Sequence, residues 1–318
     1  MIKSPLTEVP YRYFKEFIAP ATDRFAFLNA LLDKLDLRRS TLTIAGHRHF
    51  MVFPPLEGQS LPEEEKKARG HGGKWNGTAL HVSSVPIVLV AHYDRVADSP
   101  GANDNSAAVF LLIETAMKLR QKKSKNWIII FTDKEELTCG EGIKSQGSYT
   151  LAMGLRRAGL GGGRFFIFDA CGTGDTLIIS TTADHLMKNE KGLGITKTRQ
   201  AVQQLRNLAL ETTRELHMDK VLLLPTPFSD DAGFLRAGIP AQTITVLPGK
   251  EAGPFISLLR NKPGLDQALV NREIQQQVDR RLIPETWRRL NGPGDSYPRL
   301  TPEHFFQVVR FACALSKK

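Results

Sequence analysis

Short apolar runs alternate with amphipathic segments along most of the chain. The three clearest runs are rich in β-branched and aromatic residues and are too short for typical helices; they lie at 86–91, 127–131 and 164–168. Runs of this kind are typical of strands that are buried on both faces of a parallel sheet. The segments predicted to be helices lie at 106–120, 147–157, 197–217 and 301–316. This alternation predicts an α/β fold with a mixed, mostly parallel central sheet and helices on both faces.

The remaining segments complete a single predicted domain over 1–318. Its first part, 1–85, is expected to hold two helices between 11 and 35 divided by Pro20, a hairpin at 41–53 with Gly46 in the turn, and a polar surface loop at 54–84. Further predicted strands lie at 176–180, 221–224 and 242–247. The basic stretch 249–290 is interpreted as an irregular insertion.

Imidazole and carboxylate groups follow the three clearest strands. The first strand ends in His92-Tyr93-Asp94, the second runs into Glu135-Glu136, and the third is followed by Asp169. Asp104 lies in the loop after the first strand. The carboxyl ends of neighbouring parallel strands meet at one edge of a sheet, so these groups can converge. So many carboxylates would repel one another without a cation, and a mixed His/carboxylate set suits Zn²⁺ or a similar divalent ion.

Each carboxylate taken alone has a simpler interpretation. Asn103 or Asp104 reads as the N-cap of the helix that follows. Asp230 and Asp231 are either helix caps or part of a cleft that favours a substrate's free amino group. It is the order of the groups on successive strand ends that favours a site over separate caps.

Composition and charge narrow the class of protein. The formal net charge is +10, but Lys and Arg are spread along the chain, so no nucleic-acid partner is predicted. The three cysteines are too scattered for a disulfide framework or a Cys-based zinc site. The N-terminus lacks a signal-peptide pattern, and no apolar stretch approaches the roughly 18 residues of a membrane span. We therefore expect a cytoplasmic protein with no membrane partner; the sequence does not indicate the oligomeric state.

The order of these motifs resembles the M28 family of zinc aminopeptidases. The resemblance rests on HYD at 92–94, SPGANDN at 99–105, EEL at 135–137, Asp169, Gly238-Ile239-Pro240 and a closing Asp295-Ser296, and it covers roughly 86–316. It implies a three-layer zinc-exopeptidase fold and a peptide or small aminoacyl substrate.

The resemblance also implies a role for each matched residue. His92, Asp104 and Asp169 would be ligands of a first zinc, with Asp104 bridging to a second zinc that Glu136 would also bind. Asp94 would orient His92, and Glu135 would be the general base that activates water and passes its proton to the leaving amine.

The sequence departs from the family pattern at the last ligand. Asn291 stands where the family has a histidine, and Leu290 stands where some members have a tyrosine. An amide is a poor zinc ligand, so we expect one zinc to be held firmly and the second site to be weakened. His304 could substitute in principle, but a surface histidine on the closing helix is the simpler interpretation.

Two function classes follow from this pattern. The first is a metal-dependent exopeptidase of aminopeptidase type, with Glu135 as its base. The alternative is a catalytically impaired M28-like domain that binds a peptide or partner, because Asn291 replaces the final ligand. A one-zinc glutaminyl cyclase ranks third, since those enzymes use the histidine that is missing here. No organic cofactor is predicted.

Overall fold

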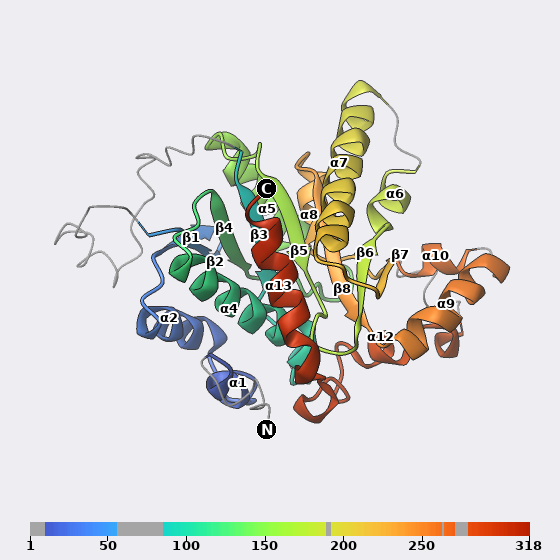
Figure 1. Cartoon of the computed structure of the whole chain (residues 1–318), viewed down its shortest axis with the longest axis horizontal. Helices are drawn as coiled ribbons and strands as arrows, with labels where there is room; N and C mark the ends of the chain where they lie inside the picture. The colour runs from blue at the N-terminus through green and yellow to red at the C-terminus, as the bar shows by residue number, and fades with distance from the viewer. Residues whose placement is uncertain (1–9, 56–84, 189–191, 263, 271–278) are drawn as a thin grey trace.

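One eight-stranded sheet runs through the protein (Figure 1). The computed structural model describes residues 10–55, 85–188, 192–262, 264–270 and 279–318. The strands are β1 (Arg39–Ile44), β2 (His47–Val52), β3 (Ile87–His92), β4 (Trp127–Thr132), β5 (Arg164–Phe168), β6 (Thr176–Ser180), β7 (Val221–Leu224) and β8 (Ala241–Leu247). Their order across the sheet is β1-β2-β4-β3-β5-β8-β6-β7.

The centre of the sheet is parallel. Strand β3 pairs with β4 on one side and with β5 on the other, and β5 pairs with β8, all in parallel. The hairpin β1–β2 joins β4 in antiparallel orientation, and β6 is antiparallel to β8. The predicted mixed, mostly parallel sheet is confirmed, and so is the hairpin with its turn at Gly46.

The helices, in chain order, are α1 (Phe14–Phe17), α2 (Arg24–Lys34), α4 (Ala108–Gln121), α5 (Gly147–Arg157), α6 (Thr182–Leu186), α7 (Leu193–Glu215), α8 (Asp230–Arg236), α9 (Gly249–Asn261), α10 (Leu265–Ala268), α12 (Glu285–Arg289) and α13 (Phe305–Leu315). Among the described residues, none of these helices is both long enough and apolar enough to cross a membrane.

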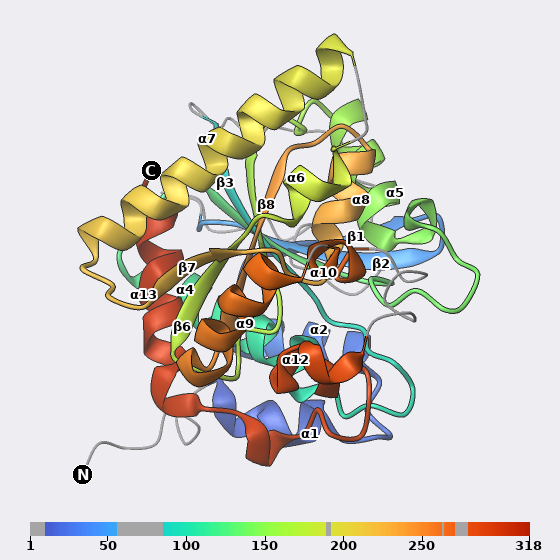
Figure 2. The same ribbon diagram turned by 90° about the vertical axis from the view of Figure 1, so that its right-hand side faces the viewer.

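Side chains alternate between the two faces of the central strands, as the period of a strand requires. In β3, Ile87, Leu89 and Ala91 pack into one core, whereas Val88 and Val90 pack into the other. Helices α4 and α13 and the N-terminal helices cover the first face, and α5 and α8 cover the second (Figures 1 and 2). The three-layer arrangement therefore follows from apolar residues on both sides of each central strand.

The segment after β8 differs from the irregular insertion that the sequence suggested. It contains the 13-residue helix α9, followed by α10 and α12. Their apolar side chains, including Phe255 and Trp287, pack with Ile178 of β6 and Leu247 of β8. This part of the chain is thus a packed layer on the β6–β8 end of the sheet (Figure 2). The polar loop predicted at 54–84 lies outside the described residues.

Candidate metal centre

Three adjacent strands deliver the charged groups to one edge of the sheet. His92 is the last residue of β3, and Asp169 follows β5 directly. Glu135 and Glu136 follow β4 after a two-residue connection. Because β4, β3 and β5 are neighbours and parallel, their carboxyl ends lie side by side. The convergence expected from the sequence is present.

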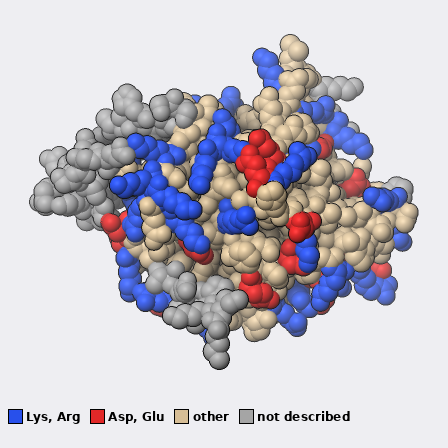
Figure 3. Space-filling view, viewed as in Figure 1, with Lys and Arg blue, Asp and Glu red and all other residues tan. Residues whose placement is uncertain are grey.

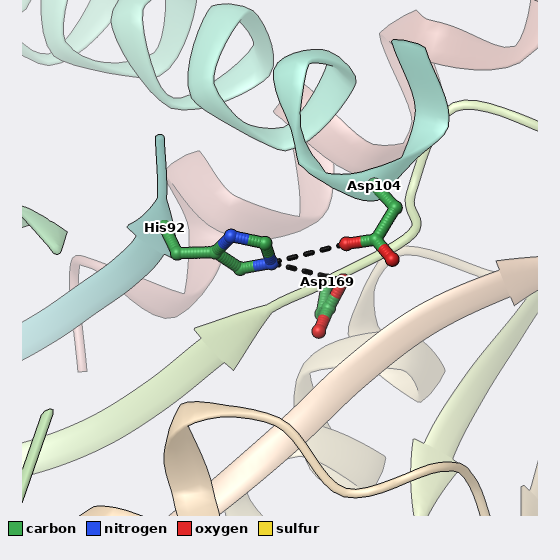
Figure 4. A group of neighbouring side chains, drawn as sticks. All are labelled: His92, Asp104 and Asp169. Atoms are coloured by element: carbon green, nitrogen blue, oxygen red, sulfur yellow. Dashed lines mark ion pairs between the residues drawn. The ribbon is translucent and has the colours of Figure 1, made fainter. Parts of the chain in front are cut away.

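His92 points its Nε2 atom between two carboxylates (Figure 4). The Nε2 atom is 3.1 Å from Oδ1 of Asp104 and 3.9 Å from Oδ1 of Asp169. The imidazole is fully buried, and neither ring nitrogen has a well-aligned hydrogen bond. A buried nitrogen without a partner is costly. The lone pair of Nε2 is therefore directed at a point where a cation would be shared by the three side chains.

Asp94 links the imidazole to the glutamate loop. Its Oδ1 atom is 3.3 Å from Nδ1 of His92. Its two oxygens also accept hydrogen bonds from the backbone N–H groups of Glu135 and Glu136, both at 3.1 Å. Burial alone would raise the pKa of Asp94, but the nearby imidazole of His92 and the hydrogen bonds from the two amides outweigh it and lower that pKa. Asp94 thus stays charged and fixes the ring and the loop together.

An irregular turn at Ala102–Ala107, with non-helical backbone angles at Asp104 and Asn105, presents Asp104. It begins after Gly101, whose φ of +59° is the left-handed region that glycine favours. Asp295 holds the turn from the far end of the chain: its carboxylate accepts the N–H groups of Asn103 (2.7 Å) and Asp104 (2.9 Å). The prediction that Asn103 or Asp104 is the N-cap of α4 is wrong, because α4 continues directly from this turn.

The site carries more negative than positive charge. Burial and the nearby Asp169 raise the pKa of Asp104, and burial together with Asp104 raises the pKa of Glu136 to about 9. Burial opposes a charge on His92, but the surrounding carboxylates raise its pKa well above the usual value. Neighbouring carboxyl groups whose pKa values are raised by mutual repulsion are typical of a site that binds a cation, because the cation would stabilise their charged forms.

The donor set fits a zinc ion. Ligand atoms of His92, Asp104 and Asp169 lie within 4.8 Å of one another, and so do those of His92, Glu135 and Glu136. A catalytic zinc site usually has three protein ligands and one open position, and His92 with the two carboxylates supplies three ligands. The residues present are therefore suited to hold the metal.

Glu135 is buried beside this donor set and has a partner of its own. Gln146, fully buried before α5, donates from Nε2 to Oε1 of Glu135 over 3.1 Å. Burial raises the pKa of Glu135 well above its usual value, and Glu136 and Asp169 add to the effect. A carboxyl group with a raised pKa can both take up and release a proton near neutral pH.

The model of peptidase family M28 matches residues 73–268, which is more than half of the chain. The chain belongs to peptidase family M28. No curated protein matches it.

Solved structures similar to this M28 peptidase share its fold at low identity. The aminopeptidase LapA of Legionella pneumophila is 14% identical with a TM-score of 0.57, and the similarity covers 96% of this chain and 66% of that one. A glutaminyl cyclase of Bacteroides thetaiotaomicron is 16% identical with a TM-score of 0.56, over 97% and 96% of the two chains. For the zinc aminopeptidase BSAP of Bacillus subtilis, the identity is 18% and the TM-score 0.49, over 84% of this chain and 48% of that one. The M28 chain thus spans about half the length of BSAP.

Asn291 lies against Glu136 in this M28 chain. It has a φ of +62°. In the orientation that satisfies its amide, the nitrogen donates to both carboxylate oxygens of Glu136, at 2.6 and 3.0 Å. The amide therefore occupies the side of Glu136 where a further metal ligand would be expected.

Other residues named from the sequence lie away from the cavity that contains these groups. Asp230 and Asp231 are buried and do not line it; Asp230 accepts a hydrogen bond from Thr132, and Asp231 accepts the N–H of Ser229. Burial raises the pKa of Asp230 to about 7. His304 lines a different hollow, as does His217. Of the two earlier interpretations, a cleft lined by these aspartates is not supported.

Sequence reasoning missed two residues that support the site. Gln146 was not singled out, and neither was Arg24 of α2. The guanidinium of Arg24 is buried and donates to the backbone carbonyl groups of Tyr93 (3.0 Å), Asp94 (3.2 Å) and Pro100 (2.7 Å). No local pattern marks either residue, because each partner lies elsewhere in the sequence or on the backbone.

Proposed function

We propose that this M28 chain is a metal-dependent exopeptidase that removes N-terminal residues from short peptides. The observation that carries the proposal is the position of Glu135, buried and hydrogen-bonded by Gln146, in the same cavity as the ligands Asp104 and Asp169. A carboxyl base beside a metal-ligand set is the arrangement that hydrolysis of an amide requires.

Each residue has a separate task in this proposal. His92, Asp104 and Asp169 hold one zinc, which supplies Lewis-acid chemistry toward water and the scissile carbonyl when bound. Asp94 keeps the ring of His92 in orientation. Glu135 takes a proton from the attacking water and delivers it to the leaving amine, while Gln146 keeps the carboxylate in place.

The second metal site is weakened in this proposal. Glu136 would need a further ligand, and Asn291 instead donates hydrogen bonds to its carboxylate. An amide N–H group cannot ligate a metal, so binding a second ion would require Asn291 to turn its oxygen inward. We therefore expect about one zinc per chain.

A second candidate is a domain that binds peptides without cleaving them. The same contact between Asn291 and Glu136 supports it, because the amide gives both side-chain oxygens of Glu136 a hydrogen-bond partner without a metal. The two candidates differ in metal content and in the need for Glu135.

The test is to measure zinc per chain and the release of amino acids from a panel of dipeptides and aminoacyl anilides. The panel is run with and without added Zn²⁺, beside Glu135→Gln, and includes an N-terminal glutaminyl peptide to detect cyclisation. We expect zinc-dependent release that Glu135→Gln abolishes. Bound zinc without turnover supports the binding role, and neither zinc nor turnover would refute the enzyme.

A further inference from the structure

The cavity over the metal ligands has a second charged part. Its volume is about 240 Å³, and its lining includes Asp104, Glu135, Glu136 and Asp169. Residues of the layer that follows β8 also line it, among them Arg280 and Trp287. Arg280 is the one cation among the described lining residues. The cavity therefore combines an acidic centre with a single guanidinium.

The guanidinium of Arg280 has few protein partners. The neighbouring Asp279 pairs with Arg281 instead: Nε of Arg281 donates to both carboxylate oxygens of Asp279, at 3.0 Å. Glu285 is paired with Arg289. Among the described residues, Arg280 makes no ion pair, and its one side-chain hydrogen bond is a 3.5 Å contact with the carbonyl oxygen of Arg288. The side chain of Arg280 is exposed, so its five donor N–H groups otherwise bind water and can exchange that water for a ligand.

The chemistry of such a guanidinium selects a carboxylate. Arginine presents a planar fork that matches a carboxylate in a bidentate manner. The acidic lining of the cavity repels an anion from the strand ends, so a carboxylate is directed to Arg280 and an amino group to the acidic part. A short peptide carries both groups a few ångströms apart.

The volume of the cavity and the net charge of the chain are both consistent with a small substrate that carries an anionic group. A volume of about 240 Å³ lies below the roughly 300–1,000 Å³ of sites for drug-sized ligands. The net charge of the chain is +10, and Lys and Arg are spread over the face shown in Figure 3. A positive surface attracts anionic ligands over a distance.

We propose that Arg280 binds a carboxylate on the leaving side of the substrate, so that this chain prefers dipeptides and other very short peptides with a free carboxylate. The inference rests on the proposed exopeptidase function and names its substrate class. Arg280 is a specificity residue in it, separate from the groups that act on the scissile bond.

The experiment compares Ala-Leu, its C-terminal amide, and the amide of Ala-Glu, which has only a side-chain carboxylate. We expect kcat/KM for Ala-Leu to exceed that for its amide by about ten- to hundredfold, as a charge-assisted hydrogen bond implies. Arg280→Gln should remove that difference, chiefly through KM, and Arg280→Lys should restore part of it. If kcat/KM for the amide of Ala-Glu equals that for Ala-Leu, Arg280 binds a side-chain carboxylate as well as a C-terminal one.

The matched control is Arg281→Gln, because Arg281 pairs with Asp279 and does not line the cavity. Equal kcat/KM for Ala-Leu and the amides in the unaltered protein would overturn the inference. So would an Arg280→Gln variant in which kcat/KM for Ala-Leu and for its amide fall by the same factor. Absence of turnover on every substrate would instead count against the exopeptidase. In that case, calorimetry of Ala-Leu and its amide decides the inference, since equal binding of the two overturns it.

Discussion

Gln146 donates a hydrogen bond from its side-chain amide to the carboxylate of Glu135, over 3.1 Å, and both residues are buried. Its amide also lies 3.3 Å from the backbone carbonyl oxygen of Glu135. One side chain thus holds both the backbone and the carboxyl group of the proposed base. The orientation of Glu135 therefore depends on a residue that precedes α5.

Replacing Gln146 tests that dependence. We expect Gln146→Leu to lower kcat about ten- to hundredfold, because a hydrogen bond to a charged group contributes about 1.5–3 kcal/mol. Zinc per chain should not change, since Gln146 contacts none of the ligands His92, Asp104 and Asp169. Gln203→Leu is the control, because Gln203 bonds to Asn207 and Arg206 on α7 and does not line the cavity. An unchanged kcat, or a fall in zinc content, would contradict the proposed role.

Restoring a histidine at the last ligand position tests the second metal site. We expect Asn291→His to raise the zinc content from about one toward two per chain, because imidazole is a far better zinc ligand than an amide. Asn291→Ala removes the hydrogen bonds to Glu136 without adding a ligand, so its zinc content should stay near one. Elemental analysis after dialysis against trace zinc measures both. A native chain that already holds two zinc ions would refute the weakened site.

Arg24 is expected to stabilise the loop that carries Asp94 and leads to Asp104. Arg24→Met leaves three backbone carbonyl oxygens without their donor, so the free energy of unfolding should fall by about 3 kcal/mol or more. Urea unfolding measures the change. Arg12→Met, which alters an exposed arginine, should change the stability little. Equal stability of the two variants would show that the bonds of Arg24 contribute nothing.

Removing the metal should destabilise the folded chain. The carboxylates of buried Asp104 and of half-buried Asp169 and Glu136 repel one another, and a cation that binds only the folded state adds to its stability. We expect a chelator to lower the thermal midpoint by several degrees and added Zn²⁺ to restore it, as measured by calorimetry. The shift should be lost in Asp169→Asn. A midpoint that is insensitive to chelation in the native chain would argue against a resident metal.

The sequence predicted the parts of the site that depend on local pattern. The apolar runs that became β3, β4 and β5 are marked by composition, and the position of His92, Glu135 and Asp169 follows from the geometry of parallel strands. The ligand roles remain predictions. The fold class and the family followed from the same runs and motifs.

The parts that were missed or wrong depend on contacts between distant residues. The predicted cap at Asn103 or Asp104 was wrong because α4 begins only at Ala108, after an irregular turn whose N–H groups are held by Asp295, about 190 positions later. The helix α9 was missed because its apolar side chains, such as Phe255, meet a layer that only the folded chain provides. Arg24 carries no sequence signal for its role, since it binds backbone carbonyl groups that any residue has.

The lining of the cavity comes from several separate stretches of chain. The groups proposed to act on the scissile bond follow β3, β4 and β5, whereas Arg280 and Trp287 belong to the layer after β8. Substitutions in that later layer can change which peptides are accepted without touching the hydrolytic groups. Selectivity and chemistry are therefore free to evolve independently in this chain, and exchanging the later layer between homologues is a route to new substrate preferences.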